Sequence, residues 1–170
     1  DALVDANTIS TWGEGRGTDG IVVDAGAFAV QPGHVRITGN RVKQRAERGI
    51  ALRTAVRTFM VKQNILDGVG HGIMIEGKGQ AERVAVENNE VFDVGIQGDA
   101  LGFGAGISVN HATSAAIVGN TVARVGNQFV EGAELAGIGE VATEDVRISG
   151  NVVEEFGPPE GGSVGALGIA

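Results

Sequence analysis

The chain has 170 residues, 42% of them hydrophobic, which is enough for a single domain with a continuous core. It contains 29 Gly but no Cys, so disulfide bonds and thiolate metal sites are excluded and many tight turns are expected. The net charge of -8 gives no basic surface for nucleic acid, and no apolar run reaches the roughly 20 residues of a membrane-spanning helix, so we expect neither partner.

One short phrase occurs six times along the chain, as apolar-x-apolar-x-x-Asn-x-apolar followed after a variable gap by Gly-Ile. In chain order its asparagines are Asn7, Asn40, Asn64, Asn89, Asn120 and Asn151, and the Gly-Ile pairs begin at Gly20, Gly49, Gly72, Gly106, Gly137 and Gly168. The apolar residues within each copy alternate with period two, which indicates half-buried strands. About three short strands per copy predict a parallel β-solenoid.

Stacking explains why the same residue types return at the same positions. Equivalent residues of successive coils in such a solenoid lie about 4.8 Å apart, so like side chains form ladders. We expect Val and Ile to fill the interior, and each Asn to bond the Asn above and below it while adopting left-handed backbone angles. The Gly before each Ile is expected to form a second turn. These columns therefore predict architecture and no chemistry.

A different local structure can be written for residues 43–57. Ala46, Ile50 and Val56 lie loosely on one side of a helix drawn through this segment. The strand prediction is preferred because Gly49-Ile50 is in register with the other five copies.

The phrases VRITGNRV (35–42), VAVENNEV (84–91), AAIVGNTV (115–122) and VRISGNVV (146–153) resemble the repeats of the pectate-lyase-like right-handed β-helix superfamily. The resemblance covers nearly all of the chain and implies an all-β fold, a right-handed, single-stranded parallel β-helix of about six coils. The superfamily includes polysaccharide lyases, glycoside hydrolases, alginate epimerases, phage tailspikes and proteins with no known reaction. No catalytic motif of these enzymes is present here, so the resemblance alone assigns no function.

We expect residues 1–170 to form one β-helix domain. Neither end shows the polar cap that a solenoid needs over its open core. The chain is therefore expected to be a piece of a longer β-helix, or to have its ends covered by another subunit, as in a homo-oligomer.

Charged residues form two neighbouring columns beside the Gly-Ile strands of the first three copies. Asp19, Arg48 and His71 stand directly before the Gly, and Asp24, Arg53 and Glu76 stand three places after the Ile. We expect both columns to point outward and to form a charged patch. The expected catalytic residues are Arg48, His71 and Glu76; the expected substrate-binding residues are Asp19, Asp24, Arg53 and Trp12.

These residue types suit an acidic polysaccharide. Arginine binds sugar carboxylates bidentately, and a histidine or a carboxylate can transfer protons, as a polysaccharide lyase or glycoside hydrolase requires. Trp12 could stack on a sugar ring or cover the open end of the core. Between Asn and Gly lie 12, 8, 7, 16, 16 and 16 residues in successive copies, so the later insertions could form a wall beside Arg48 and His71.

Two further interpretations stay open. The columns could be a solvated surface of alternating charge on a non-catalytic structural or adhesive module, such as part of a surface or tail-fibre-like protein. Calcium could bind at Asp19, Asp24 or Glu76, although the neighbouring arginines oppose it, and no other cofactor is expected. A polysaccharide partner implies a secreted or cell-surface protein.

Overall fold

The structure is a computed structural model that describes residues 1–10, 19–24, 33–43, 47–95, 103–126, 134–156 and 165–169. Within these ranges all regular elements are β-strands, and their strand pairings are parallel. No helix in this part of the chain is long and apolar enough to cross a membrane. The predicted all-β, parallel architecture is therefore confirmed.

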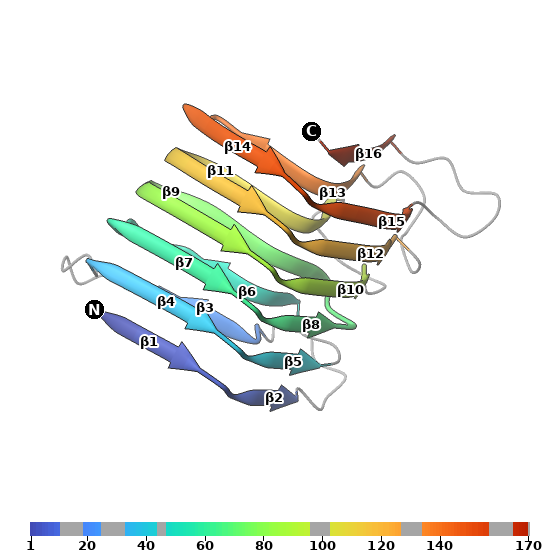
Figure 1. Cartoon of the computed structure of the whole chain (residues 1–170), viewed down its shortest axis with the longest axis horizontal. Coiled ribbons are helices and arrows are strands. Elements are labelled where there is room, and N and C mark those ends of the chain that lie inside the picture. Colours follow the sequence, from blue (N-terminus) through green and yellow to red (C-terminus); the bar gives the residue numbers. More distant parts are fainter. Residues whose placement is uncertain are drawn as a thin grey trace.

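The strands form two sheets whose members stack one above another (Figure 1). The ten-stranded sheet contains β1 (Ala2–Asp5), β3 (Ile21–Val23), β4 (His34–Thr38), β6 (Arg48–Leu52), β7 (Thr58–Lys62), β9 (His71–Glu87), β11 (Phe103–Val118), β13 (Glu134–Val141), β14 (Asp145–Ser149) and β16 (Gly165–Ile169). The six-stranded sheet contains β2 (Thr8–Ser10), β5 (Arg41–Lys43), β8 (Ile65–Asp67), β10 (Glu90–Val94), β12 (Thr121–Val125) and β15 (Val152–Phe156).

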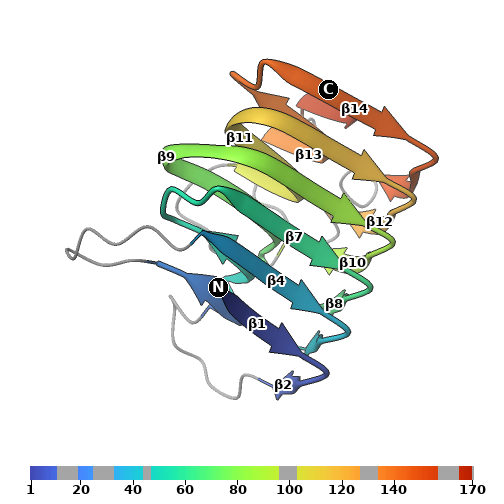
Figure 2. The same ribbon diagram turned by 60° about the vertical axis from the view of Figure 1, so that its left-hand side comes forward.

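The larger sheet curls because β9 and β11 each run through two of its faces (Figure 2). Early in β9, Ile73 pairs with Ile50 of β6, whereas later Val86 pairs with Val61 of β7. Two expected short strands are thus one continuous bent strand in these copies. The pairing of β11 with β9 shifts register between Asn110 and Ala112, where β11 passes from one face of the sheet to the other.

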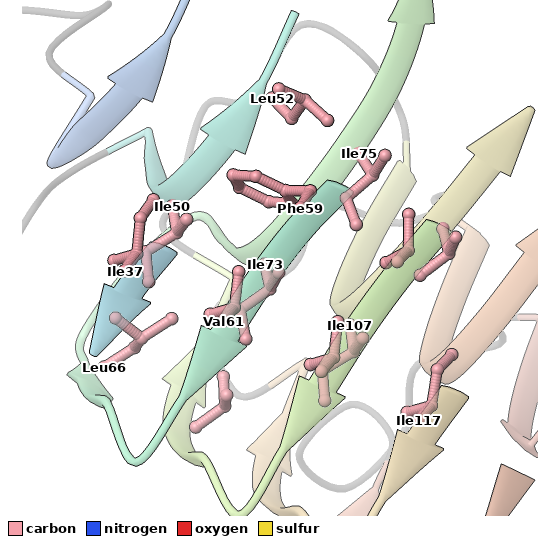
Figure 3. Close-up of a cluster of buried hydrophobic side chains, with 14 of the residues drawn as sticks. Ile37, Ile50, Leu52, Phe59, Val61, Leu66, Ile73, Ile75, Ile107 and Ile117 are labelled. Atoms are coloured by element: carbon pink, nitrogen blue, oxygen red, sulfur yellow. The ribbon is translucent and has the colours of Figure 1, made fainter. Parts of the chain in front are cut away.

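Aliphatic side chains fill the interior that the curled sheet encloses. Ile37, Ile50, Ile73, Ile107 and Ile117 are fully buried in one continuous cluster. Figure 3 shows the ring of Phe59, the largest of these side chains, pointing into the same interior. The predicted Val and Ile core is confirmed.

The six repeat asparagines form a hydrogen-bonded ladder. The backbone N–H and the Nδ2 amide of Asn64 both donate to Oδ1 of Asn89, at 3.0 Å each, and Asn40 donates to Asn64 in the same way at 2.9 and 3.0 Å. The pattern continues from Asn7 to Asn151. Each Nδ2 also donates to strand carbonyls, which for Asn64 are those of Ile37 and Lys62. The predicted Asn-to-Asn bonding is confirmed.

The expected backbone conformation of these asparagines is wrong by one residue. The left-handed residue is the one before each ladder asparagine: Ala6, Gly39, Gln63, Asn88, Gly119 and Gly150 all have φ between 53° and 67°. The asparagines are therefore selected for their side-chain bonds, and the turn itself is made by their predecessors.

The glycines of the Gly-Ile pairs also differ from the prediction, because five of the six lie inside strands, and Gly20 directly precedes β3. A Cβ added at Gly49 would lie 2.9 Å from the carbonyl oxygen of Gly72 and 2.9 Å from Cδ1 of Leu66, so close packing excludes a side chain. Positive φ instead recurs at the ends of strands of the six-stranded sheet: Gly68 follows β8, and Asp93, Arg124 and Glu155 are the penultimate residues of β10, β12 and β15.

The helical alternative for residues 43–57 is wrong where this segment is described. β6 covers Arg48–Leu52, and Ile50 pairs with both Ile21 and Ile73. The register of the Gly-Ile pairs was the correct guide.

Candidate functional site

Five charged residues meet beside β3, β6 and β9, and we call Asp19, Glu47, Arg48, Arg53 and Glu76 the charged cluster. Arg48 begins β6 and Arg53 follows its end, while Asp19 precedes β3 and Glu76 lies in β9. The Arg48 guanidinium is 3.1 Å from Glu76, 3.2 Å from Glu47 and 3.4 Å from Asp19. The Arg53 guanidinium is 2.7 Å from Asp19 and 3.3 Å from Glu76.

The strand register produces this meeting and confirms the predicted neighbours. Arg48 pairs with His71, and the N–H of Gly20 donates to the Arg48 carbonyl at 2.8 Å, which sets Asp19 beside Arg48. In the second column the N–H of Arg53 donates to the carbonyl of Val23 at 2.9 Å, next to Asp24, and Asn110 pairs with Glu76.

The two columns are joined by long side chains. The backbone of Arg48 lies opposite His71, five residues before Glu76, yet Nε of Arg48 reaches Oε1 of Glu76. The two side chains must therefore extend toward each other along the strand direction. This diagonal contact could not be predicted from the alignment of backbone positions alone.

Burial separates the members of the predicted patch. The side chains of Arg48 and Asp19 are each 10% exposed, whereas those of Arg53 and Glu76 are 30% and 28% exposed. His71 is fully buried, so it adds no solvent-exposed surface to the predicted patch.

The carboxylates fix the charge state of Arg48. Burial alone would lower the pKa of its guanidinium, but the charges of Glu76, Asp19 and Glu47 outweigh burial and raise the pKa above its ordinary value. Arg48 is therefore a permanent cation that holds three carboxylates together.

Two predicted binding residues have different outcomes. Asp24 is exposed at the end of β3, beside the charged cluster. Trp12, together with the insertions expected to build a wall, lies outside the described residues.

No group of three or more His, Asp or Glu side chains that could hold a metal ion occurs within the described ranges. In the charged cluster the carboxylate oxygens of Asp19 and Glu76 already accept hydrogen bonds from two guanidiniums. A calcium ion would have to compete with these cations.

Among the ion pairs that sequence reasoning missed, the one between Arg124 and Asp93 has the best hydrogen-bond geometry. Nε and the terminal Nη2 of Arg124 donate to Asp93 at 2.7 and 2.9 Å, and the guanidinium carbon lies 5.4 Å from the ring centre of Phe92. Asp93 and Arg124 each stand four places after a ladder asparagine. An alignment of the repeats would therefore have predicted that the two residues are neighbours. Glu47, by contrast, carried no repeat signal.

Taken together, a curled parallel sheet, an asparagine ladder and an aliphatic interior define a parallel β-solenoid. The family model for the right-handed β-helix region matches residues 1–153, and the chain belongs to that family. Searches of curated proteins and of solved structures returned no match.

Proposed function

We propose that this β-helix is a carbohydrate-associated protein that binds an acidic polysaccharide across the outer face of β3, β6 and β9. The observation that carries the proposal is the row formed by Asp24, Arg53, Glu76 and Asn110 on four adjacent strands, with Arg53 and Glu76 each partly open to solvent. Planar carboxylate, guanidinium and amide groups bind sugar hydroxyls and carboxylates through paired hydrogen bonds. A glycan lying along the stack would meet one such group about every 4.8 Å.

Within the charged cluster, Arg53 is the cation best placed to bind a sugar carboxylate. It is three times as exposed as Arg48, at 30% against 10% of the side chain. Because Asp19 and Glu76 already bind Arg53, an acidic glycan must compete with them. We therefore expect modest affinity that falls as salt rises, since the contact is an exposed charge pair.

Binding is better supported than cleavage. A pectate-lyase-like or glycoside hydrolase reaction needs an acid or base in contact with the substrate. Among the residues proposed for that role, His71 is fully buried and the pKa of Arg48 is raised, which opposes loss of its proton. Glu76 is partly exposed, but both of its oxygens accept hydrogen bonds from arginines.

A second candidate function is that of a non-catalytic structural or adhesive β-helix module, as in a surface or tail-fibre-like protein. Its support is the mutual pairing within the charged cluster, where two guanidiniums engage three carboxylates. Such pairing is what a purely structural role would need.

The proposal extends to the setting of the protein. We infer that the six asparagines mark six coils of one domain over residues 1–170, which could be part of a longer β-helix or of a homo-oligomer. A polysaccharide partner favours a secreted or cell-surface location. Nucleic acid and membranes are not proposed as partners, and calcium is retained only as a candidate ion at Asp19, Asp24 or Glu76.

A glycan panel tests the proposal. Binding of uronate and neutral polysaccharides is measured by affinity electrophoresis at low and high salt, and the mixtures are assayed for unsaturated and reducing-end products. We expect a uronate polymer to be retarded, and Arg53→Ala to weaken its binding about tenfold, the effect of one charge-assisted hydrogen bond. The matched control is Arg57→Ala, which removes an arginine that is 68% exposed and lies outside the charged cluster.

The other outcomes decide between the alternatives. Absence of binding to every glycan would overturn the proposal in favour of the structural module. Product formation that disappears in both Arg48→Ala and His71→Ala would overturn it in favour of an enzyme.

A further inference from the structure

A second site lies on a different face of the β-helix, over β1, β4 and β7. An open surface depression of about 360 Å³ is lined there by Asp1, Leu3, His34, Arg36, Thr58 and Met60, together with Ala2 and Val35. This volume is within the range of about 300 to 1,000 Å³ that is usual for small-molecule sites. The charged cluster, on β3, β6 and β9, contributes no residue to it.

The register of the three strands explains why these side chains converge. Leu3 pairs with Arg36, and Arg36 pairs with Met60, which gives one row across the three strands. His34 pairs with Thr58 in the row beside it. Since Val35, Ile37 and Phe59 alternate with these residues and are buried, the two rows face outward.

The lining combines a cation with apolar surface. Arg36 is exposed and, within the described ranges, takes part in none of the ion pairs that hold Arg48, Arg53 and Arg124. Leu3 is 64% exposed and leaves apolar surface beside the guanidinium. The histidine at position 34 begins β4 and is exposed on the same side as Arg36.

We propose that this depression, hereafter the Arg36 pocket, binds a carboxylate-bearing sugar. The Arg36 guanidinium would take the carboxylate in a bidentate arrangement, and Leu3 and Met60 would pack against the apolar C–H face of the ring. Asp1 and Thr58 offer oxygens to the sugar hydroxyls. A uronic acid has hydroxyl groups that can bind these oxygens, whereas a plain organic acid has only its carboxylate, so the lining favours the uronic acid.

The proposal goes beyond the polysaccharide-binding face and is independent of it. Among the residues that the structure describes, Arg36 has no salt-bridge partner, whereas Arg53 is bound to both Asp19 and Glu76. A single uronic acid unit can therefore occupy the Arg36 pocket even if no polymer binds to β3, β6 and β9.

The two methionines of the chain provide separate reporters. Met60 lines the Arg36 pocket. Met74 instead lies on β9, two residues before Glu76 of the charged cluster, and pairs with Ala51 of β6. Protein labelled with ¹³C at the methionine methyl groups is titrated with galacturonate, galactose and hexanoate, and the two methyl signals are followed by NMR. Arg36→Gln and Arg53→Gln are titrated in parallel, because neither change adds a methionine.

We expect galacturonate to shift the Met60 signal, galactose to have no effect, and Arg36→Gln to weaken the galacturonate response about tenfold while Arg53→Gln leaves it unchanged. A weaker response to hexanoate supports a sugar ligand, and an equal response overturns the sugar assignment in favour of a general organic acid. A Met60 signal that no probe shifts, or a response unaltered in Arg36→Gln, overturns the pocket itself. A shift of Met74 alone does the same while supporting the polysaccharide-binding face.

Discussion

The asparagine ladder and the charged cluster both consist of side chains stacked on neighbouring parallel strands, but they satisfy their polar groups in opposite ways. In the ladder each asparagine donates to the next one, so a single residue type serves every position. In the charged cluster two arginines bridge three carboxylates, and no member can replace another. The ladder can therefore be extended without limit, whereas the cluster is complete within three strands.

The asparagine ladder is also more deeply buried than the charged cluster. Asn64 and Asn120 have no exposed surface, so an unpaired group there would have no water to replace the lost partner. Arg53 and Glu76 keep about a third of their side chains in solvent. Loss of a ladder residue should therefore cost more stability than loss of a charged one, and the cluster has more freedom to change its contacts.

The largest expected effect comes from breaking the ladder in its middle. Asn64→Ala removes the acceptor of both Asn40 donors and the donor to the carbonyls of Ile37 and Lys62. Several buried polar groups then lose partners, and we expect the free energy of unfolding to fall by at least about 3 kcal/mol in urea denaturation. Asn7→Ala is the matched control, because Asn7 is exposed and stands at the end of the ladder. Equal losses for the two variants would show that burial does not set the value of a ladder residue.

A smaller effect is expected from removing the central cation of the charged cluster. Arg48→Met keeps most of the side-chain volume but leaves Asp19 and Glu76 with Arg53 as their remaining cation, and Glu47 without its arginine. We expect a loss of about 2 kcal/mol, less than for a fully buried pair because two of the carboxylates are partly solvated. Arg57→Met should change stability by less than about 0.5 kcal/mol, since that exposed pair is 3.8 Å apart. A loss from Arg48→Met no greater than that from Arg57→Met would mean that the cluster does not stabilise the fold.

The same contrast explains what could be predicted from the sequence. The ladder and the aliphatic core repeat six times, so each copy supports the interpretation of the others, and both were confirmed. The charged cluster occurs once, and only the neighbouring positions of its members could be predicted. The direction of Arg48 along the strand, the participation of Glu47 and the burial of His71 depend on side-chain reach and local packing, for which the sequence has no repeated signal.

The smallest expected effect tests whether exposure is the quantity that separates the ladder from charged pairs. Arg124 and Asp93 form a bidentate pair of good geometry, at 2.7 and 2.9 Å, but their side chains are 39% and 41% exposed. Arg124→Met should therefore lower the free energy of unfolding by less than about 1 kcal/mol, despite better hydrogen bonds than those of Arg48. The remaining effect should shrink when the urea titration is repeated in about 1 M NaCl, where charges are screened beyond roughly 3 Å. If Arg124→Met instead costs as much as Arg48→Met at both salt concentrations, geometry outweighs exposure, and the partly exposed contacts of Arg53 and Glu76 would have to be regarded as structural as well.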